Sequence, residues 1–325
     1  MPGNYFARTG ICGRCGRERR SHLCASHQPP FSPLHYFLML RSIRQVLPAT
    51  PNQAANLALL QPLPSELLPE LDPFLLLHHI GPEEFPPYND GLPFGPHPHR
   101  GFETVTVVLE GEVEHQDSRG NQGVVGAGGA QWMTAARGII HAENLPRHMR
   151  HTGGRLELPQ LWLNLPAARK MEQPHYQNLP AATLPRVTPA AGAELRVLAG
   201  EWEGVRGPAR SRLPGLRLGL LELAAGATYR LALPPSEAVL CYVVRGELLV
   251  NKVAAGAHSL VEFGEEGQLV HVQGTTPATV LLGAAPPLRE PVARQGPYVM
   301  NTTTQLMEAL CDYQLGRMGV FIPIV

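Results

Sequence analysis

Short apolar runs separated by glycine-containing turns dominate the chain from about residue 70 onward. Residues 104–109 read TVTVVL and are rich in β-branched side chains, which favours a strand, and a Glu-Gly turn follows them. A second short run at 113–115 ends at a polar turn cluster, residues 117–121. Because no helical period accompanies these runs, the pattern predicts a small antiparallel β-barrel or jelly roll.

The same pattern returns later in the chain. Residues 239–244 read VLCYVV, an Arg-Gly turn follows, and residues 247–250 read ELLV. Placing Gly246 on Gly111 gives an offset of 135 residues. We interpret this as an internal repeat, and the fold class predicted is all-β with two barrels of one design.

A helix is predicted only near the end of the chain. Thr302 and its neighbours are suitable N-cap residues, apolar residues follow at helical spacing, and Gly316 is a suitable stop. The expected organisation is an N-terminal extension, a metal-binding barrel, a barrel without metal, and a C-terminal helix with a tail, over residues 1–50, 51–180, 181–300 and 301–325.

The first fifty residues differ in character from the rest. They contain seven Arg, one acidic residue and three of the five Cys. Cys12, Cys15, His22 and Cys24 are zinc-ligand types, although their spacing matches no common zinc finger. An organelle transit peptide is an alternative. The interpretation we favour is an unstructured or wrongly included extension, with the true start near Met39.

Charge and hydropathy narrow the functional classes. The 27 basic and 27 acidic residues cancel, which argues against direct nucleic-acid or membrane-surface binding, since both partners are polyanions. Without the basic first fifty residues, 20 positive and 26 negative charges remain. No apolar run reaches the roughly 18 residues that a membrane helix needs. We expect a cytoplasmic protein.

Two pairs of polar residues carry the candidate chemistry. His97 and His99 lie two residues apart, as do His141 and Glu143, so each pair projects from one face of a strand. Inside a barrel the four side chains can converge on one ion, although such pairs are more often ordinary surface or core residues. Three imidazoles and one carboxylate suit iron, with manganese, nickel, copper and zinc as alternatives.

The second half lacks these residues. At the offset of 135, the four positions fall on residues without ligand groups, Ala232, Pro234, Thr276 and Ala278. A requirement of the scaffold for His would have appeared in both halves. The ligand set therefore belongs to one barrel only.

The motifs around these pairs resemble the pirin family of the cupin superfamily. Residues 97–105 (HPHRGFETV) and 131–143 (QWMTAARGIIHAE) are similar to its signatures, and two further stretches, 161–177 and 290–302, extend the likeness over roughly residues 70–315. Ala136 stands where the family commonly has Gly.

The resemblance implies a fold and a metal site. The fold is a bicupin of two β-barrels, with Fe(II) in the N-terminal barrel only. The implied ligands are His97, His99, His141 and Glu143. Glu103 occupies a position where many cupins have a ligand, and here we interpret it as structural or as a support for the ligands.

The resemblance also implies a function. Several members resemble quercetin 2,3-dioxygenases, so we expect an enzyme that opens a flavonol ring with O2 and releases carbon monoxide. Glu143 would serve as both ligand and base. The alternative is an iron- and redox-dependent regulatory protein that binds a transcription factor or a metabolic enzyme. A metal-free storage role is disfavoured by the complete ligand set.

For several other residues the sequence predicts ordinary surface or structural roles. We expect His78 and His79 to be solvated. For His115 we favour a hydrogen bond that stabilises the turn at Asp117, and the alternative is that it orients a group behind the metal ligands. Four apolar residues near the motifs are either pocket walls or plain core: Phe94, Phe102, Trp132 and Met133. Cys241 and Cys311 are interpreted as structural residues in a strand and a helix.

Overall fold

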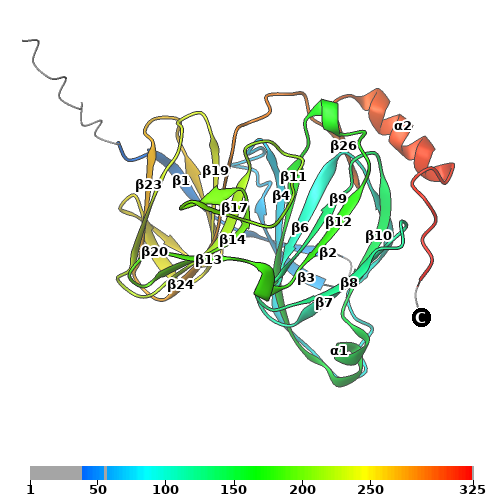
Figure 1. The fold of residues 1–325 in the computed structure, drawn as a ribbon, viewed down its shortest axis with the longest axis horizontal. Coiled ribbons are helices and arrows are strands. Elements are labelled where there is room, and N and C mark those ends of the chain that lie inside the picture. The colour runs from blue at the N-terminus through cyan, green and yellow to red at the C-terminus, as the bar shows by residue number, and fades with distance from the viewer. Residues whose placement is uncertain (1–38, 55–56, 324–325) are drawn as a thin grey trace, which may run out of the picture. The chain divides into compact units, whose positions relative to one another are not determined.

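Two barrels of antiparallel strands make up the computed structural model, which describes residues 39–54 and 57–323 (Figure 1). In the first barrel one sheet has seven strands, in the order β12 (His175–Leu179), β9 (Ala130–Thr134), β6 (Phe102–Val107), β11 (Gly154–Asn164), β4 (Phe74–Phe85), β3 (Leu57–Leu63) and β2 (Thr50–Ala54). The other has four, in the order β5 (Phe94–His99), β10 (Ile139–Asn144), β7 (Glu112–Asp117) and β8 (Gln122–Gly126).

The second barrel repeats this plan. Its seven-stranded sheet runs β1 (Ile43–Pro48), β22 (Ser259–Phe263), β19 (Ala238–Arg245), β24 (Ala278–Ala285), β17 (Arg217–Leu223), β14 (Ala193–Ala199) and β13 (Arg186–Ala190). Its four-stranded sheet runs β18 (Thr228–Ala232), β23 (Leu269–Gly274), β20 (Glu247–Val250) and β21 (Val253–Gly256). The all-β prediction with two barrels is confirmed.

A few short elements complete the chain. They are two small hairpins, β15 (Glu201–Trp202) with β16 (Val205–Arg206) and β25 (Ala293–Gln295) with β26 (Tyr298–Met300), two single 3₁₀ turns, η1 (Ala167–Arg169) and η2 (Ala181–Thr183), and two helices, α1 (Arg147–Thr152) and α2 (Thr303–Gln314). The sequence predicted α2, whose N-cap Thr302 accepts a hydrogen bond from the Gln305 backbone as expected, but it did not predict α1.

The two seven-stranded sheets share one hydrophobic core. Leu240, Tyr242 and Val244 of β19 pack in this shared cluster, whereas the alternate residues Cys241 and Val243 fill the interior of the second barrel. A sheet that is buried on both faces is apolar at every position, and not only at alternate ones. This is why β19 appears in the sequence as a continuous apolar run.

The described fold begins earlier than the expected boundary at residue 50. β1 lies within the expected extension, yet it pairs with β22 at the edge of the second barrel, with Val46 opposite Val261. The Cys and His residues considered as zinc ligands lie outside the described residues. Among the described residues, no helix is long and apolar enough to cross a membrane.

Candidate metal centre

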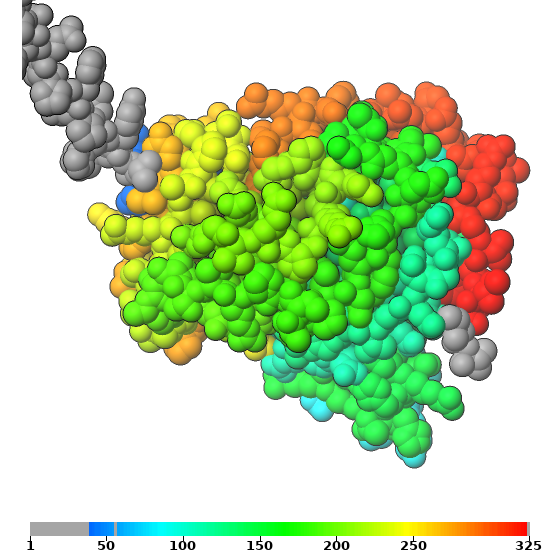
Figure 2. All heavy atoms as spheres, in the orientation of Figure 1, coloured from blue at the N-terminus to red at the C-terminus, as the bar shows by residue number. Residues whose placement is uncertain are grey.

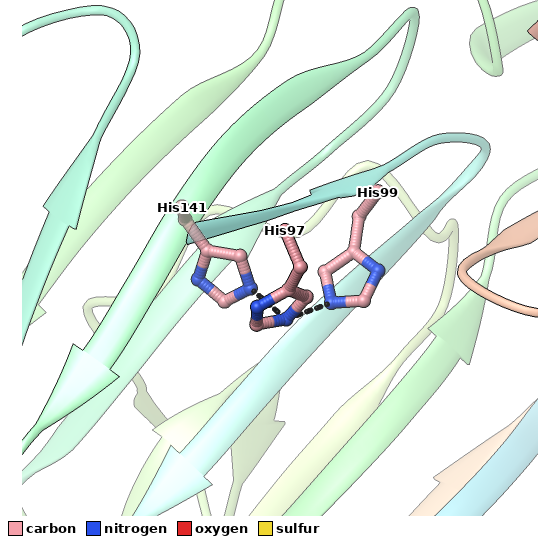
Figure 3. Close-up of side chains that lie close together, drawn as sticks. All are labelled: His97, His99 and His141. Atoms are coloured by element: carbon pink, nitrogen blue, oxygen red, sulfur yellow. Dashed lines mark hydrogen bonds between the residues drawn. The ribbon is translucent and has the colours of Figure 1, made fainter. Parts of the chain in front are cut away.

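Three histidine side chains converge inside the first barrel (Figure 3). β5 and β10 are antiparallel neighbours, and their register places His141 opposite His97 and Ile139 opposite His99. Because side chains alternate along a strand, His97 and His99 project from the same face. His99 and His141 are buried, and His97 is half-buried.

The Nε2 atoms of the three rings face one another. Nε2 of His97 lies 3.1 Å from Nε2 of His99 and 3.0 Å from Nε2 of His141. The Nδ1 atoms of His97 and His99 lie 2.7 Å and 3.2 Å from the carbonyl oxygens of Gly95 and Pro297. A carbonyl oxygen only accepts, so each Nδ1 carries the proton and each facing Nε2 presents a lone pair.

Facing lone pairs at this distance repel unless a cation lies between them. The imidazole donors and their orientation therefore fit a divalent transition metal. Burial, reinforced by the nearby His97, lowers the pKa of His99 to about 3. Burial and the neighbouring histidines likewise hold the pKa of His141 well below its usual value. Both rings are therefore neutral near pH 7, as metal ligation requires.

Glu143, the fourth predicted ligand, lies in the same cavity but outside this group of three. Its Oε1 accepts a hydrogen bond from the Thr106 hydroxyl at 3.0 Å, and its Oε2 accepts one from Gln160 Nε2 at 2.7 Å. The Gln160 amide also receives a bond of 3.4 Å from the Trp162 indole. Sequence reasoning missed Thr106 and Gln160. The only signal for Thr106 is its position in the predicted strand 104–109, and no predicted strand included Gln160.

A second layer of polar groups lies behind His141. His115 is buried, with its Nε2 3.2 Å from Asp117 Oδ2, and its ring stacks on Tyr176 with centroids 4.0 Å apart. The His115 ring centroid lies 5.4 Å from that of His141. The expected contact with Asp117 is present, while Asp117 itself accepts from the turn amides of Arg119 and Asn121. His115 thus packs beneath a candidate ligand, a role beyond stabilising a turn.

A cavity of about 240 Å³ opens beside the histidines. Its polar lining is His78, Glu143 and Gln160 with the histidine pair of β5, and its apolar lining includes Ile80, Phe94 and Trp162. Gly296 and Pro297, which come from the far end of the chain, also line it. Phe94 is therefore a wall residue.

The other three apolar residues belong to the core. Trp132 packs in the cluster shared by the two barrels, Met133 packs with Ile139, and Phe102 stacks on Trp162 at 4.3 Å. None of the three lines the cavity.

The prediction that His78 and His79 are solvated was wrong. His78 lines the cavity, and burial lowers its pKa to about 4. His79 is fully buried between the barrels, where its Nδ1 lies 2.8 Å from the Tyr242 hydroxyl and its Nε2 lies 3.1 Å from Glu157 Oε1. Adjacent residues of a strand face opposite sides, so His78 lines the cavity and His79 lies at the interface between the barrels.

Glu103 has the structural role expected of it. Its buried carboxylate accepts hydrogen bonds from the Trp132 indole, the Thr134 hydroxyl, the Ser211 hydroxyl and the Arg212 backbone. Burial raises the pKa of Glu103, and these hydrogen bonds oppose the shift. The contacts join β6 to the segment between β16 and β17, and they leave the carboxylate with no part in the histidine group.

The second barrel has apolar side chains at the positions of the candidate ligands. Three strands of the second barrel hold the same places in their sheet as β5, β10 and β7 in the first barrel: β18, β23 and β20. Placing the turn at Gly246 on the turn at Gly111 then aligns the residues of the two barrels. The strand registers then match the candidate ligands with four buried apolar residues of the second barrel, Leu231, Leu233, Val270 and Val272.

These positions correct those obtained from the constant offset, which were Ala232, Pro234, Thr276 and Ala278. The offset of 135 fails because the connections differ in length between the two barrels. The conclusion that the second barrel lacks the ligand set is unaffected, and the interior of that barrel is one apolar cluster.

The comparisons with known proteins agree with this architecture. The pirin family model matches residues 56–163, and the model of the pirin C-terminal cupin domain matches residues 220–319. The chain belongs to the pirin family. Pirin-1 of Arabidopsis thaliana is 38% identical to it over 256 residues, which cover 77% of this chain and 84% of that protein.

Two bacterial relatives carry a more specific name. A Pseudomonas aeruginosa protein with the provisional name of a quercetin 2,3-dioxygenase is 41% identical over 248 residues, 76% of this pirin-family chain and 86% of that protein. The crystal structure of quercetin 2,3-dioxygenase from Acinetobacter baumannii superposes with a TM-score of 0.82 at 32% identity, covering 87% of this chain and all of that one.

Proposed function

We propose that this chain is a metal-dependent dioxygenase that opens the ring of a flavonol such as quercetin with O2. The observation that carries the proposal is the convergence of the three Nε2 atoms of His97, His99 and His141 beside a cavity. The similarity to the Acinetobacter baumannii enzyme supports the choice of substrate class.

The proposed ligands are the three histidines, with Glu143 as the fourth. Iron(II) is the ion we propose, and manganese, nickel, copper and zinc are the alternatives. A bound ion of this kind supplies Lewis acidity and open coordination positions for a chelating oxygen pair. The carbonyl oxygens of Gly95 and Pro297 hold His97 and His99 in the tautomer that ligation requires.

Glu143 is proposed to accept the proton of the flavonol 3-hydroxyl. Glu143 is 6% exposed, and two hydrogen bonds from Thr106 and Gln160 fix the orientation of its carboxylate. The same two hydrogen bonds hold the Glu143 carboxylate at the cavity. Loss of that proton leaves an electron-rich flavonolate. The two atoms of O2 bond to the two carbons that flank C3, and the two bonds to C3 break. C3 leaves with its own oxygen as carbon monoxide, and the proton returns from Glu143 to the ring-opened ester acid.

The cavity walls suit a flat aromatic substrate. Phe94, Ile80 and Trp162 line one part of it, and such walls exclude water from the reacting ring. Its volume of about 240 Å³ lies below the roughly 300 Å³ at which small-molecule sites usually begin. The size therefore favours a compact, planar ligand over a bulky one.

Flavonol binding and turnover can be separated by oxygen. The iron-loaded protein is mixed with quercetin without O2, and the shift of the flavonol absorption band gives its affinity. We expect the band of the deprotonated flavonol to appear, and to decay with release of carbon monoxide when air is admitted. Glu143→Gln should bind quercetin without forming that band.

Binding of quercetin by the loaded protein without turnover in air would refute the dioxygenase proposal. That result would favour the regulatory alternative, in which the metal controls binding to a protein partner.

A further inference from the structure

The chain returns from the second barrel to the first before it ends. β26 lies beside the segment that follows His99: the Arg100 amide donates to Pro297 O at 3.4 Å, and the Val299 amide donates to Arg100 O at 3.0 Å. Figure 2 shows the C-terminal residues (red) beside the teal and green part of the first barrel, and away from the yellow part of the second barrel. Residues 296–300 therefore form one structural unit with residues 99–101.

This unit reaches a candidate ligand directly. Pro297 O accepts the Nδ1 hydrogen of His99 at 3.2 Å, and Pro297 also lines the cavity. The contact fixes the tautomer of His99 and orients its Nε2 toward the other two rings. A shift of β26 would remove this acceptor.

Lys170 forms hydrogen bonds to both segments. Its side chain is 1% exposed, and its Nζ donates to Gly101 O at 2.7 Å, to Val299 O at 3.1 Å and to Asn164 Oδ1 at 2.6 Å. An ammonium group has three hydrogens, and here each has one acceptor. Two of those acceptors are backbone oxygens, one on each segment, so a single nitrogen fixes the distance between them.

Two further features keep the segments together. Gly101 has a φ of +93°, and a Cβ at this position would collide with the Val299 carbonyl, so the close approach depends on glycine. On the outer side, Arg100 Nη2 donates to Asp312 Oδ2 of α2 at 2.8 Å. The Lys170 hydrogen bonds and the Arg100–Asp312 ion pair thus both attach the C-terminal segment to the first barrel.

We propose that Lys170 is a positioning residue of the metal centre: by clamping Val299 to Gly101 it holds the Pro297 carbonyl against His99. The inference rests on the proposed metal site. It adds that metal affinity in the first barrel depends on a lysine that touches no ligand and on a segment that follows the second barrel.

The test uses the full chain and cobalt(II) as the probe. Affinity is measured by competition with a chelator, and the visible absorption of bound cobalt reports its coordination. We expect Lys170→Met to bind cobalt about 10- to 100-fold more weakly, with an altered spectrum. Lys252→Met, at the exposed and only other lysine of the chain, is the matched control and should match the wild type.

Asp312→Asn is a milder variant for use if Lys170→Met does not fold. We expect its affinity for cobalt to fall by less than that of Lys170→Met, and its spectrum to change in the same direction. Unchanged affinity and spectrum in a folded Lys170→Met, or in Asp312→Asn when only that variant folds, would overturn the inference. Failure of the wild type to bind cobalt would instead overturn the proposed metal site, so the two failures are distinguishable.

Discussion

Nδ1 of His99 donates its hydrogen to the carbonyl oxygen of Pro297, a residue 198 positions further along the chain. The donor belongs to the first barrel, and the acceptor follows the whole of the second. A candidate metal centre inside one barrel is therefore completed by a segment that follows the other barrel in the sequence. Conserving the motif residues of the first barrel alone would not preserve this geometry.

The amide of Gln160 is predicted to support the reaction through Glu143. Gln160→Leu removes the 2.7 Å hydrogen bond to Glu143 Oε2 and leaves the carboxylate held by Thr106 alone. We expect turnover of quercetin to fall about 10- to 100-fold, with little loss of bound metal, because the histidines keep their own supports. Steady-state kinetics and metal analysis of the same sample check this. Gln177→Leu, whose side chain bonds to the Arg210 backbone, is the control.

Equivalent positions of the two barrels are predicted to respond in opposite ways. Val270 is the counterpart of His141 and is fully buried in the apolar interior of the second barrel. Val270→Ala should lower the free energy of unfolding by about 1–3 kcal/mol and leave the metal content unchanged. His141→Ala should abolish metal binding. Urea denaturation of the metal-free proteins, with metal analysis, measures both effects, and loss of metal from Val270→Ala would contradict the assignment.

Acid should destabilise the interface between the barrels through His79. Burial, together with the charge of Arg245, lowers the pKa of His79 to about 4 from 6.5. Glu157 does not reverse this shift because Arg245 already pairs with it. Between pH 6.5 and pH 4, His79 binds a proton in the unfolded chain but not in the folded chain. The free energy of unfolding therefore falls as the pH drops from 6.5 to 4, and His79 does not change it above that range.

The size of the effect follows from the shift of the pKa. The full loss attributable to His79 is about 3 kcal/mol. Chemical denaturation of metal-free protein at pH 7 and pH 4.5 should show a smaller loss in His79→Gln than in the wild type. His148→Gln, at an exposed position paired with Glu112, should behave like the wild type. Equal losses in all three proteins would show that His79 is not the titrating group.

Most of the barrel architecture could be predicted from the sequence. Continuous apolar runs such as that of β19 required burial on both faces, and the Gly111 and Gly246 turns revealed the repeat. The two i, i+2 pairs identified the histidines that the structure brings together. These signals are local, because strand alternation and tight turns are set by neighbouring residues.

The supports of the site could not be predicted in this way. Gln160, Thr106 and Pro297 act through contacts between distant strands, and no local pattern distinguishes them from other polar or turn residues. His78 and His79 were misjudged because a strand covered on both sides has no solvated face. The constant offset failed at the ligand positions because insertions between strands shift the numbering without changing the register.

The location of the bound ion is the most direct test of the account. Crystals of iron-loaded protein, measured across the iron absorption edge, should show one anomalous peak per chain. We predict that it lies about 2.1 Å from Nε2 of each of His97, His99 and His141. A peak in the second barrel near Val270, a peak at Glu103, or the absence of any peak in loaded crystals would contradict the account.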